Sequence, residues 1–192
     1  MIAAILLAAA VAADATAPEL VCACRESIPA DVSISGRLTI RNRKGMVQSE
    51  YGYELSRRSG ETSLSLKDAS GAPVPFEKGG RILDTDVTWS DLALDYLWWD
   101  DVSFDGDGES ETVHGQKCAV VLMKRGGRTV RAWVDRKTGA LMQAEELDGG
   151  KTLRRLWGTR IKKFGDRWMA NVMEVETAGS GHRTKITVEE MK

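Results

Sequence analysis

Two histidines and three cysteines are the side chains of this sequence that suggest nucleophilic or metal chemistry. His114 and Cys118 are close in sequence, but Gly115 between them indicates a turn, so they would not share a helical face as base and nucleophile. We interpret His114 as a surface turn residue. His182 begins a predicted strand, where a hydrogen bond to a neighbour is the ordinary role of a histidine. The spacing of these residues also does not match a zinc site.

An acidic, glycine-containing segment at residues 105–111 has the composition of a calcium loop. It lacks the downstream glutamate that completes calcium coordination in such a loop, so we interpret it as a solvated hairpin. The sequence also shows no phosphate-binding glycine loop, nucleophile elbow or paired-carboxylate motif. We therefore expect that the protein is not an enzyme and that it uses no metal or other cofactor.

The second half of the sequence is dominated by predicted antiparallel strands. Glycine-containing dipeptides divide residues 117–192 at short intervals, and they supply the positive φ angles of tight hairpin turns. Val130, Ala132 and Val134 alternate with polar residues, which indicates a strand with one buried face. The predicted strands are Cys118–Lys124, Thr129–Asp135, Leu141–Leu147, Thr152–Ile161, Trp168–Thr177 and Arg183–Glu190.

The first half contains one short helix and three further strands. Thr16 and Glu19 have the spacing of a capping box, which predicts an amphipathic helix at residues 18–27, ending before Pro29. Apolar and polar residues then alternate along residues 32–41, with Gly36 marking a bend or bulge. Ile34, Leu38 and Ile40 lie on the apolar face of this strand. Residues 46–57 and 61–67 form the other predicted strands.

The tryptophan-rich segment from Thr88 to Trp99 is predicted to be a helix that is apolar around most of its circumference. Thr88 and Asp91 form a capping box, and Ser90, Asp91 and Asp95 alone remain to face water. Such a helix must be covered on more than one side, either by a sheet or by a ligand. The alternative is a core helix that plugs one end of the sheet. Its apolar residues are Trp89, Leu92, Ala93, Leu94, Tyr96, Leu97, Trp98 and Trp99.

The start of the sequence indicates export. Ile2–Ala13 is an unbroken apolar run followed by small residues that suit a signal peptidase, and it is shorter than the roughly 20 residues of a membrane-spanning helix. We predict a signal peptide at residues 1–15, with cleavage between Ala13 and Pro18, and a periplasmic protein. The alternative is that the run begins an ordinary buried helix.

Several ordered motifs resemble a divergent branch of the outer-membrane lipoprotein-sorting (LolA-like) family. They are WSDLALDYLWW at Trp89–Trp99, AWVDRKTGALMQAEELDGGKTLRRLWG at Ala132–Gly158, DRWMANVMEVE at Asp166–Glu176 and GHRTKITV at Gly181–Val188. The resemblance implies one domain at residues 16–192. Its fold would be mainly β, an unclosed antiparallel β-barrel, or half-barrel, with short helices covering the concave face.

The resemblance also implies a function: a periplasmic carrier, or chaperone, that binds lipoprotein acyl chains or a similar amphiphile for transfer to the outer membrane. Its partners would be these acyl chains or another lipid, with membrane-bound release and acceptor proteins. The alternative is a non-catalytic envelope protein that uses the half-barrel as a protein-interaction module. An empty cavity in the half-barrel would favour the carrier. A cavity filled by Trp89, Trp98 and Trp99 would favour the interaction module. The candidate lipid-binding residues are Ile34, Leu38, Ile40, Leu92, Tyr96, Trp98 and Trp99.

The sequence lacks one motif of the family, the arginine that keeps the helical lid closed. The well-studied carriers hold their helical lid closed with an arginine in an Arg-Pro pair on an early strand. This sequence has no such pair, and Arg37, Arg41 and Arg57 are the candidates for its role.

Charge and cysteine content set two further expectations. With 27 basic and 28 acidic residues the net charge is −1, so no long-range field favours nucleic acid as a partner. In an exported chain Cys22 or Cys24 could pair with Cys118 in a disulfide; the alternative is that all three are buried as small apolar side chains.

Overall fold

The computed structural model describes residues 14–165 and 167–192, so the apolar run Ile2–Ala13 of the predicted signal peptide lies outside the described residues. Most of the described chain is β-strand. The helices are α1 (Ala17–Glu26), α2 (Trp89–Ala93) and the 3-10 helix η1 (Asp95–Trp98). The strands are β1 (Val32–Asn42), β2 (Val47–Arg58), β3 (Glu61–Lys67), β4 (Asp101–Phe104), β5 (Ser110–Val113), β6 (Gln116–Arg125), β7 (Arg128–Asp135), β8 (Leu141–Asp148), β9 (Lys151–Phe164), β10 (Arg167–Thr177) and β11 (His182–Met191).

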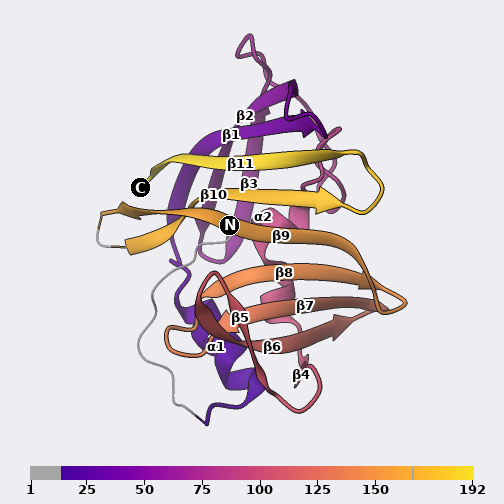
Figure 1. The fold of residues 1–192 in the computed structure, drawn as a ribbon. Coiled ribbons are helices and arrows are strands. Elements are labelled where there is room, and N and C mark those ends of the chain that lie inside the picture. Colours follow the sequence, from indigo (N-terminus) through magenta and orange to yellow (C-terminus); the bar gives the residue numbers. More distant parts are fainter. Residues whose placement is uncertain (1–13, 166) are drawn as a thin grey trace.

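All strands belong to one antiparallel sheet. Its order is β3-β2-β1-β11-β10-β9-β8-β7-β6-β4, with β5 paired to the same strand β6 as β4. Within the described ranges the edge strands β3 and β4 do not pair with each other, so the sheet is an unclosed half-barrel. Figure 1 shows the sheet curling around α2, with α1 lying against its lower part. The predicted fold class is confirmed.

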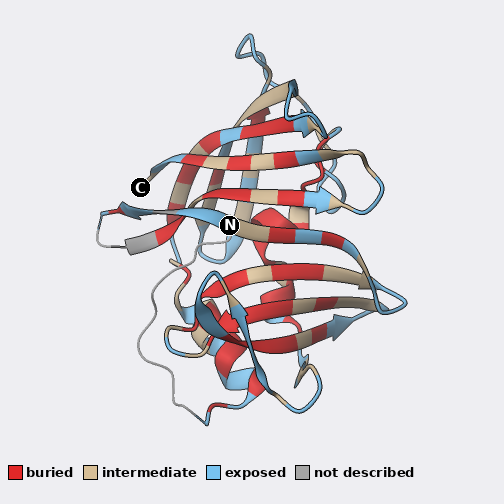
Figure 2. Cartoon of the chain, in the orientation of Figure 1, coloured by how far each residue is buried: buried red, intermediate tan, exposed pale blue. Residues whose placement is uncertain are grey.

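The concave face of the sheet is apolar because the strands alternate buried and exposed side chains. In β1, Ile34 and Leu38 are buried, whereas Arg37 between them is exposed. Figure 2 shows this alternation as red and pale bands along the strands. The predicted bulge is confirmed: the register of β1 with β11 shifts between Ser35 and Gly36. A Cβ atom at Gly36 would lie 1.9 Å from the Thr187 carbonyl oxygen, so only glycine fits there.

The predicted helix at residues 18–27 and the nine predicted strands are confirmed to within a few residues. Thr16 and Glu19 form the predicted capping box of α1. Strands β4 and β5 were not predicted: β4 ends just before the acidic segment at residues 105–111, and β5 begins within it. These strands have only four residues each, too few for alternation to be recognised. The hairpin predicted for this segment is wrong, because within the described residues β4 and β5 each pair with β6 and not with each other.

The prediction of one continuous helix from Thr88 to Trp99 is wrong. Helix α2 ends at Ala93, and Leu94 adopts the left-handed conformation with φ 51° before η1 begins. A left-handed conformation costs a residue other than glycine about 1–2 kcal/mol. Here it turns Leu94 into the core, where it is 1% exposed, so burial offsets the cost. Residues 88–99 are called the cover below.

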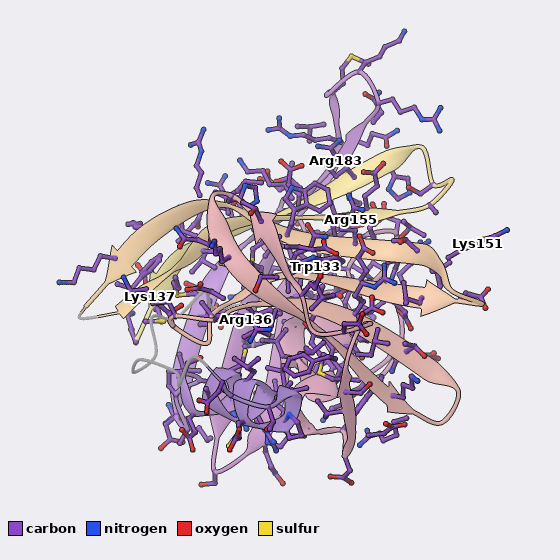
Figure 3. The ribbon with its side chains drawn as sticks, turned by 60° about the horizontal axis from the view of Figure 1, so that its bottom comes forward. Trp133, Arg136, Lys137, Lys151, Arg155 and Arg183 are labelled. Atoms are coloured by element: carbon purple, nitrogen blue, oxygen red, sulfur yellow. The ribbon has the colours of Figure 1, made fainter. Side chains whose placement is uncertain are left out.

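The convex face of the sheet carries charged side chains in cross-strand pairs. Arg155 donates to Glu145 at 2.6 Å, and Arg183 donates to Glu174 at 2.6 Å. Figure 3 shows Arg155 on β9 and Arg183 on β11. Both arginine side chains are about half exposed and Glu174 is 22% exposed, so the Arg183–Glu174 pair contributes little to stability. Glu145 is only 3% exposed, so Arg155 neutralises a buried carboxylate. None of the described helices is long and apolar enough to cross a bilayer.

Candidate functional site: the covered concave face

The cover and the concave face share one apolar core. Ile34 and Leu38 of the sheet lie in the same buried cluster as Leu92, Tyr96 and Trp99 of the cover. The structure therefore brings together five of the seven candidate lipid-binding residues.

The other two candidates lie elsewhere. Ile40 is buried at 2% exposure but is not in that cluster. Trp98, the last residue of η1, is 36% exposed and stacks with Arg57.

Arg154 of β9 connects the sheet to the cover. Its Nη1 donates to Asp91 Oδ2 at 2.5 Å and its Nη2 donates to Asp91 Oδ1 at 3.2 Å. This two-pronged geometry is the strongest form of an arginine–carboxylate pair. The Arg154 side chain is 9% exposed and that of Asp91 7%, so the pair is shielded from water and salt.

The remaining donors of Arg154 are also used. Its Nη2 donates to Thr88 Oγ1 at 3.1 Å, and its Nη1 donates to the Asp86 carbonyl at 3.0 Å. Its Nε and Nη2 donate to Glu146 of β8 at 3.2 and 3.0 Å. Arg154 thus binds the start of the cover and the neighbouring strand together. We call Arg154, Asp91, Thr88 and Glu146 the latch.

Burial and charge act in opposite directions on the latch. Burial by itself would lower the pKa of Arg154, but Asp91 and then Glu146 outweigh it and raise that pKa. Burial would likewise raise the pKa of Glu146, but Arg154 and Arg128 outweigh it and lower that pKa below its ordinary value. Arg154 and Glu146 are therefore both ionised at neutral pH.

Arg128 of β7 makes a second connection to the cover. Its Nε donates to Glu146 at 3.1 Å and its Nη2 donates to Ser90 Oγ at 3.2 Å. Its guanidinium carbon also lies 5.2 Å from the centre of the Trp99 ring, within range of a cation–π interaction. The cover is therefore bound to the sheet by charged groups around an apolar centre.

One expectation about the cover is wrong. Ser90 and Asp91 do not face water: each is 6% exposed, because Arg128 and Arg154 are their partners. Of the three candidate lid arginines, Arg57 contacts the cover, where it stacks on Trp98. Arg37 pairs with Glu50 and Glu189 on the outer face, and Arg41 is exposed.

Three polar atoms of the cover are buried without a hydrogen-bond partner in the described structure. They are one carboxylate oxygen of Asp95 (Oδ1), the Tyr96 hydroxyl and the Trp99 indole nitrogen. A buried unpaired polar group costs about 1–3 kcal/mol. Burial also raises the pKa of Tyr96 well above its ordinary value, so the hydroxyl stays protonated. The closed cover therefore carries an internal cost that opening would relieve.

The space between cover and sheet is filled by side chains. A void of only about 10 Å³ lies beside Asp91, Tyr96 and Arg154. Leu92, Leu97 and Trp99 are each at most 2% exposed and occupy the rest. Trp99 is thus the one of the three named tryptophans that is fully buried. The structure is a closed form of the half-barrel.

His182 and His114 have the roles that the sequence analysis gave them. His182 Nδ1 lies 2.8 Å from Asp86 Oδ2, and Asp86 is fully buried. Asp86 also accepts from the Thr184 hydroxyl and from the Thr177 amide. This carboxylate fixes the chain just before the cover. His114 lies in a turn with φ 49°.

The cysteines and the acidic segment show no metal or disulfide chemistry in the described residues. Cys22, Cys24 and Cys118 are free thiols; Cys24 and Cys118 are buried, but Cys22 is exposed, so neither sequence alternative is fully correct. In the acidic segment Asp105 pairs with Arg131 and Glu111 accepts from the Trp133 indole. The described chain contains no cluster of metal-ligating side chains.

Comparison with known proteins identifies the family and the fold. A family model described as "Uncharacterized protein" matches residues 73–192, more than half of the chain. The chain belongs to this family. No curated protein sequence matches it.

Three solved structures share the fold over nearly the whole chain. The LolA superfamily protein NE2245 from Nitrosomonas europaea has a TM-score of 0.74 and 14% identity, covering 93% of each chain. A putative outer membrane lipoprotein-sorting protein domain from Vibrio parahaemolyticus has a TM-score of 0.67 and 14% identity, covering 94% of this chain and 93% of that one. A DUF1329 family protein from Desulfovibrio piger has a TM-score of 0.66 and 15% identity, covering 92% and 91%. The chain therefore has the LolA-like fold.

Proposed function

We propose that this protein is a carrier that shields acyl chains of lipoproteins, or of a similar amphiphile, between its cover and its concave face, for transfer to the outer membrane. The observation that supports this most is the latch. An apolar cover over an apolar sheet needs no buried arginine to stay in place, since hydrophobic burial alone would hold it. A latch of charged groups fits a cover that must open.

The physical basis of the exchange is that cargo replaces the side chains of the cover. When the cover opens, Leu92, Leu97 and Trp99 leave an apolar surface on the sheet. An acyl chain on that surface gains about 0.8 kcal/mol per buried methylene. Opening also frees the unpaired Tyr96 hydroxyl and Trp99 nitrogen to bind water. Both contributions favour the loaded form, whereas breaking the latch disfavours it. The free-energy difference between the closed and loaded forms is therefore small enough for cargo to shift it.

The proposal includes the compartment and the partners. A carrier of this kind would work in the periplasm after removal of residues 1–15 as a signal peptide. It would receive cargo from one membrane-bound protein and deliver it to an acceptor. Support comes from the shared LolA-like fold of the three solved structures. Intact mass of protein recovered from a periplasmic fraction tests the cleavage, and a full-length cytosolic product would contradict it.

The decisive experiment measures quenching of tryptophan fluorescence by brominated fatty acids. Cargo beneath the cover must contact Trp99, so quenching should saturate, and Trp99→Phe should remove most of it. Arg154→Met should increase acyl affinity, because it weakens the closed form. The matched control is Arg183→Met, which removes a half-exposed arginine on the outer face whose partner Glu174 is also partly exposed, and it should leave the affinity unchanged.

The filled space also supports a second candidate, a protein-interaction module built on a permanently closed half-barrel. Leu92 and Leu97 pack as ordinary core side chains at 0% exposure. In that case brominated acyl chains would not quench the parent protein or the Arg154→Met variant. Such a result would reject the carrier and favour the module.

A further inference from the structure

A large pocket opens at the mouth of the half-barrel, beside the cover. It has a volume of about 790 Å³ and is lined by the β2–β3 hairpin, by cover residues and by the end of β6. Trp89, Ala93 and Trp98 supply the cover's side of the pocket. The pocket therefore lies next to the space that an opened cover would leave.

The lining of this mouth pocket is positively charged. Arg57, Arg58, Lys78 and Arg125 line it, against two acidic residues, Glu61 and Asp95, which gives an excess of two positive charges. The nearest approach between opposite charges is 4.0 Å, between Arg125 and Asp95. At that distance between partly exposed side chains the pair is weak. The cations of the pocket are thus poorly neutralised by the protein itself.

Arg57 is the cation that most lacks a partner. Its Nε is buried and has no hydrogen-bond partner among the described residues. Its guanidinium carbon lies 4.6 Å from the centre of the Trp98 ring, so the stacking holds the group at the pocket wall. Burial also lowers the pKa of Arg57, because the charge is partly desolvated without a counter-charge. An anion in the pocket would supply the missing acceptor.

The cations of the mouth pocket also contact the cover's aromatic rings. The Lys78 ammonium lies 4.8 Å from the Trp89 ring centre, and the Arg125 guanidinium 5.4 Å from that of Trp99. Trp99 is the tryptophan of the cover that is buried in the core, whereas Trp89 and Trp98 line the pocket. A single amphiphile can therefore place its chain beside Trp99 and its charged end among the cations.

We propose that the mouth pocket binds the anionic head of the cargo, a carboxylate or a phosphate attached to an acyl chain. This inference rests on the carrier function and adds the ligand class: the protein selects anionic amphiphiles over neutral or cationic ones. Arg57, Arg58 and Arg125 are the specificity residues. Guanidinium groups suit carboxylate and phosphate equally, since both offer paired oxygen acceptors.

The test compares ligands that share one dodecyl chain and differ in the head. Dodecanoate and dodecyl phosphate should bind more tightly than dodecyl maltoside or dodecyltrimethylammonium, measured by competition with a brominated fatty acid. The double variant Arg58→Gln/Arg125→Gln should weaken both anionic ligands by about tenfold, the sum of two partly exposed charge contacts. It should leave dodecyl maltoside unchanged.

The matched control is Lys137→Gln, an exposed cation in the β7–β8 turn. Figure 3 shows Lys137 at the opposite side of the molecule from Lys151 in the β8–β9 turn. In the antiparallel sheet this turn lies at the same end of the strands as Arg125 in the β6–β7 turn, so Lys137 is at the end away from the mouth pocket. This control should not change any affinity. Isothermal titration with inorganic phosphate separates the two sources of anion, because a headgroup site needs the chain and should bind phosphate far more weakly than dodecyl phosphate.

Three results would overturn the inference, and they are distinguishable. Equal affinity for all four heads would reject head selection but leave the carrier function intact. Equal affinity for phosphate and dodecyl phosphate would show an anion site unconnected to the acyl groove. Failure of every dodecyl ligand to bind would remove both the inference and the carrier function.

Discussion

The cover and helix α1 both pack against the half-barrel, but they are held in different ways. Helix α1 contributes Leu20, Val21 and Cys24 to the core, each at most 2% exposed. The cover also contributes apolar side chains to the core, but it is joined to the sheet by the buried Arg154–Asp91 pair as well. Both begin with a capping box of the same design. The two elements therefore differ in that only the cover has a buried ion pair to the sheet among the contacts of the described residues.

The comparison shows that two helical segments with apolar contacts to the core can differ in how they separate from the sheet. Apolar packing is non-directional, so it is lost gradually as the surfaces separate. A buried ion pair with fixed geometry is lost at once, and its stability depends on both partners. We infer that α1 belongs to the rigid framework and that the cover is the element that moves. Four changes test this contrast.

The largest effect is expected from Arg154→Met. The change leaves Asp91 buried without its cation, whereas Glu146 keeps Arg128, and breaking the buried pair costs about 3–5 kcal/mol in the closed form. Hydrogen exchange in residues 89–98 should therefore accelerate by at least a hundredfold, because the cover opens to solvate the Asp91 carboxylate. Exchange in residues 20–26 should stay slow. Equal acceleration in both segments would show that they form one unit.

Leu20→Ala should have the converse effect. Removing a fully buried leucine side chain from α1 lowers the free energy of unfolding by about 2–5 kcal/mol. A urea titration should show this as a lower midpoint. Since α1 belongs to the framework, the cover should not exchange selectively faster than the strands. Selective opening of residues 89–98 would make α1 part of the latch.

The two capping boxes allow a matched pair of smaller changes. Thr88→Ala removes the cap of α2 and the Arg154 Nη2 contact at 3.1 Å, whereas Thr16→Ala removes only a cap. Loss of a cap costs about 1 kcal/mol. Thr88→Ala should thus open the cover more than Thr16→Ala opens α1, as measured by hydrogen exchange. The reverse order would count against the latch.

The smallest effect is expected from acid. The pKa of Glu146 is lowered in the folded protein by Arg154 and Arg128, against the effect of burial. Its stabilisation is therefore complete above the ordinary glutamate value of 4.5 and is lost as pH falls below it. Exchange in the cover should accelerate in this range relative to α1. Glu146→Gln should reduce the pH dependence, and an unchanged profile would exclude Glu146 as the sensor.

Local patterns determined most of the fold. Alternation along β1 and the glycine turns of residues 117–192 predicted the strands, because strand period and turn chemistry depend on near neighbours in sequence. The capping boxes at Thr16 and Thr88 were found for the same reason. The continuous helix failed at Leu94, whose left-handed conformation is favoured only by the core around it.

The latch could be found only in the tertiary structure. Arg154 and Asp91 are 63 residues apart in sequence, and Arg154 sits between the exposed Leu153 and the exposed Arg155. From residue type alone, Leu153 would be expected inside and Arg154 outside. The one available signal for the opposite arrangement was period-two alternation, which places Arg154 on the same face of β9 as the buried Leu156. The sequence by itself determined where most strands, turns and both helix caps form, since these depend on short-range sterics and hydrogen bonds. Only the assembled sheet decided which arginine holds the cover, because burying a charge is favourable only where distant carboxylates are brought to meet it.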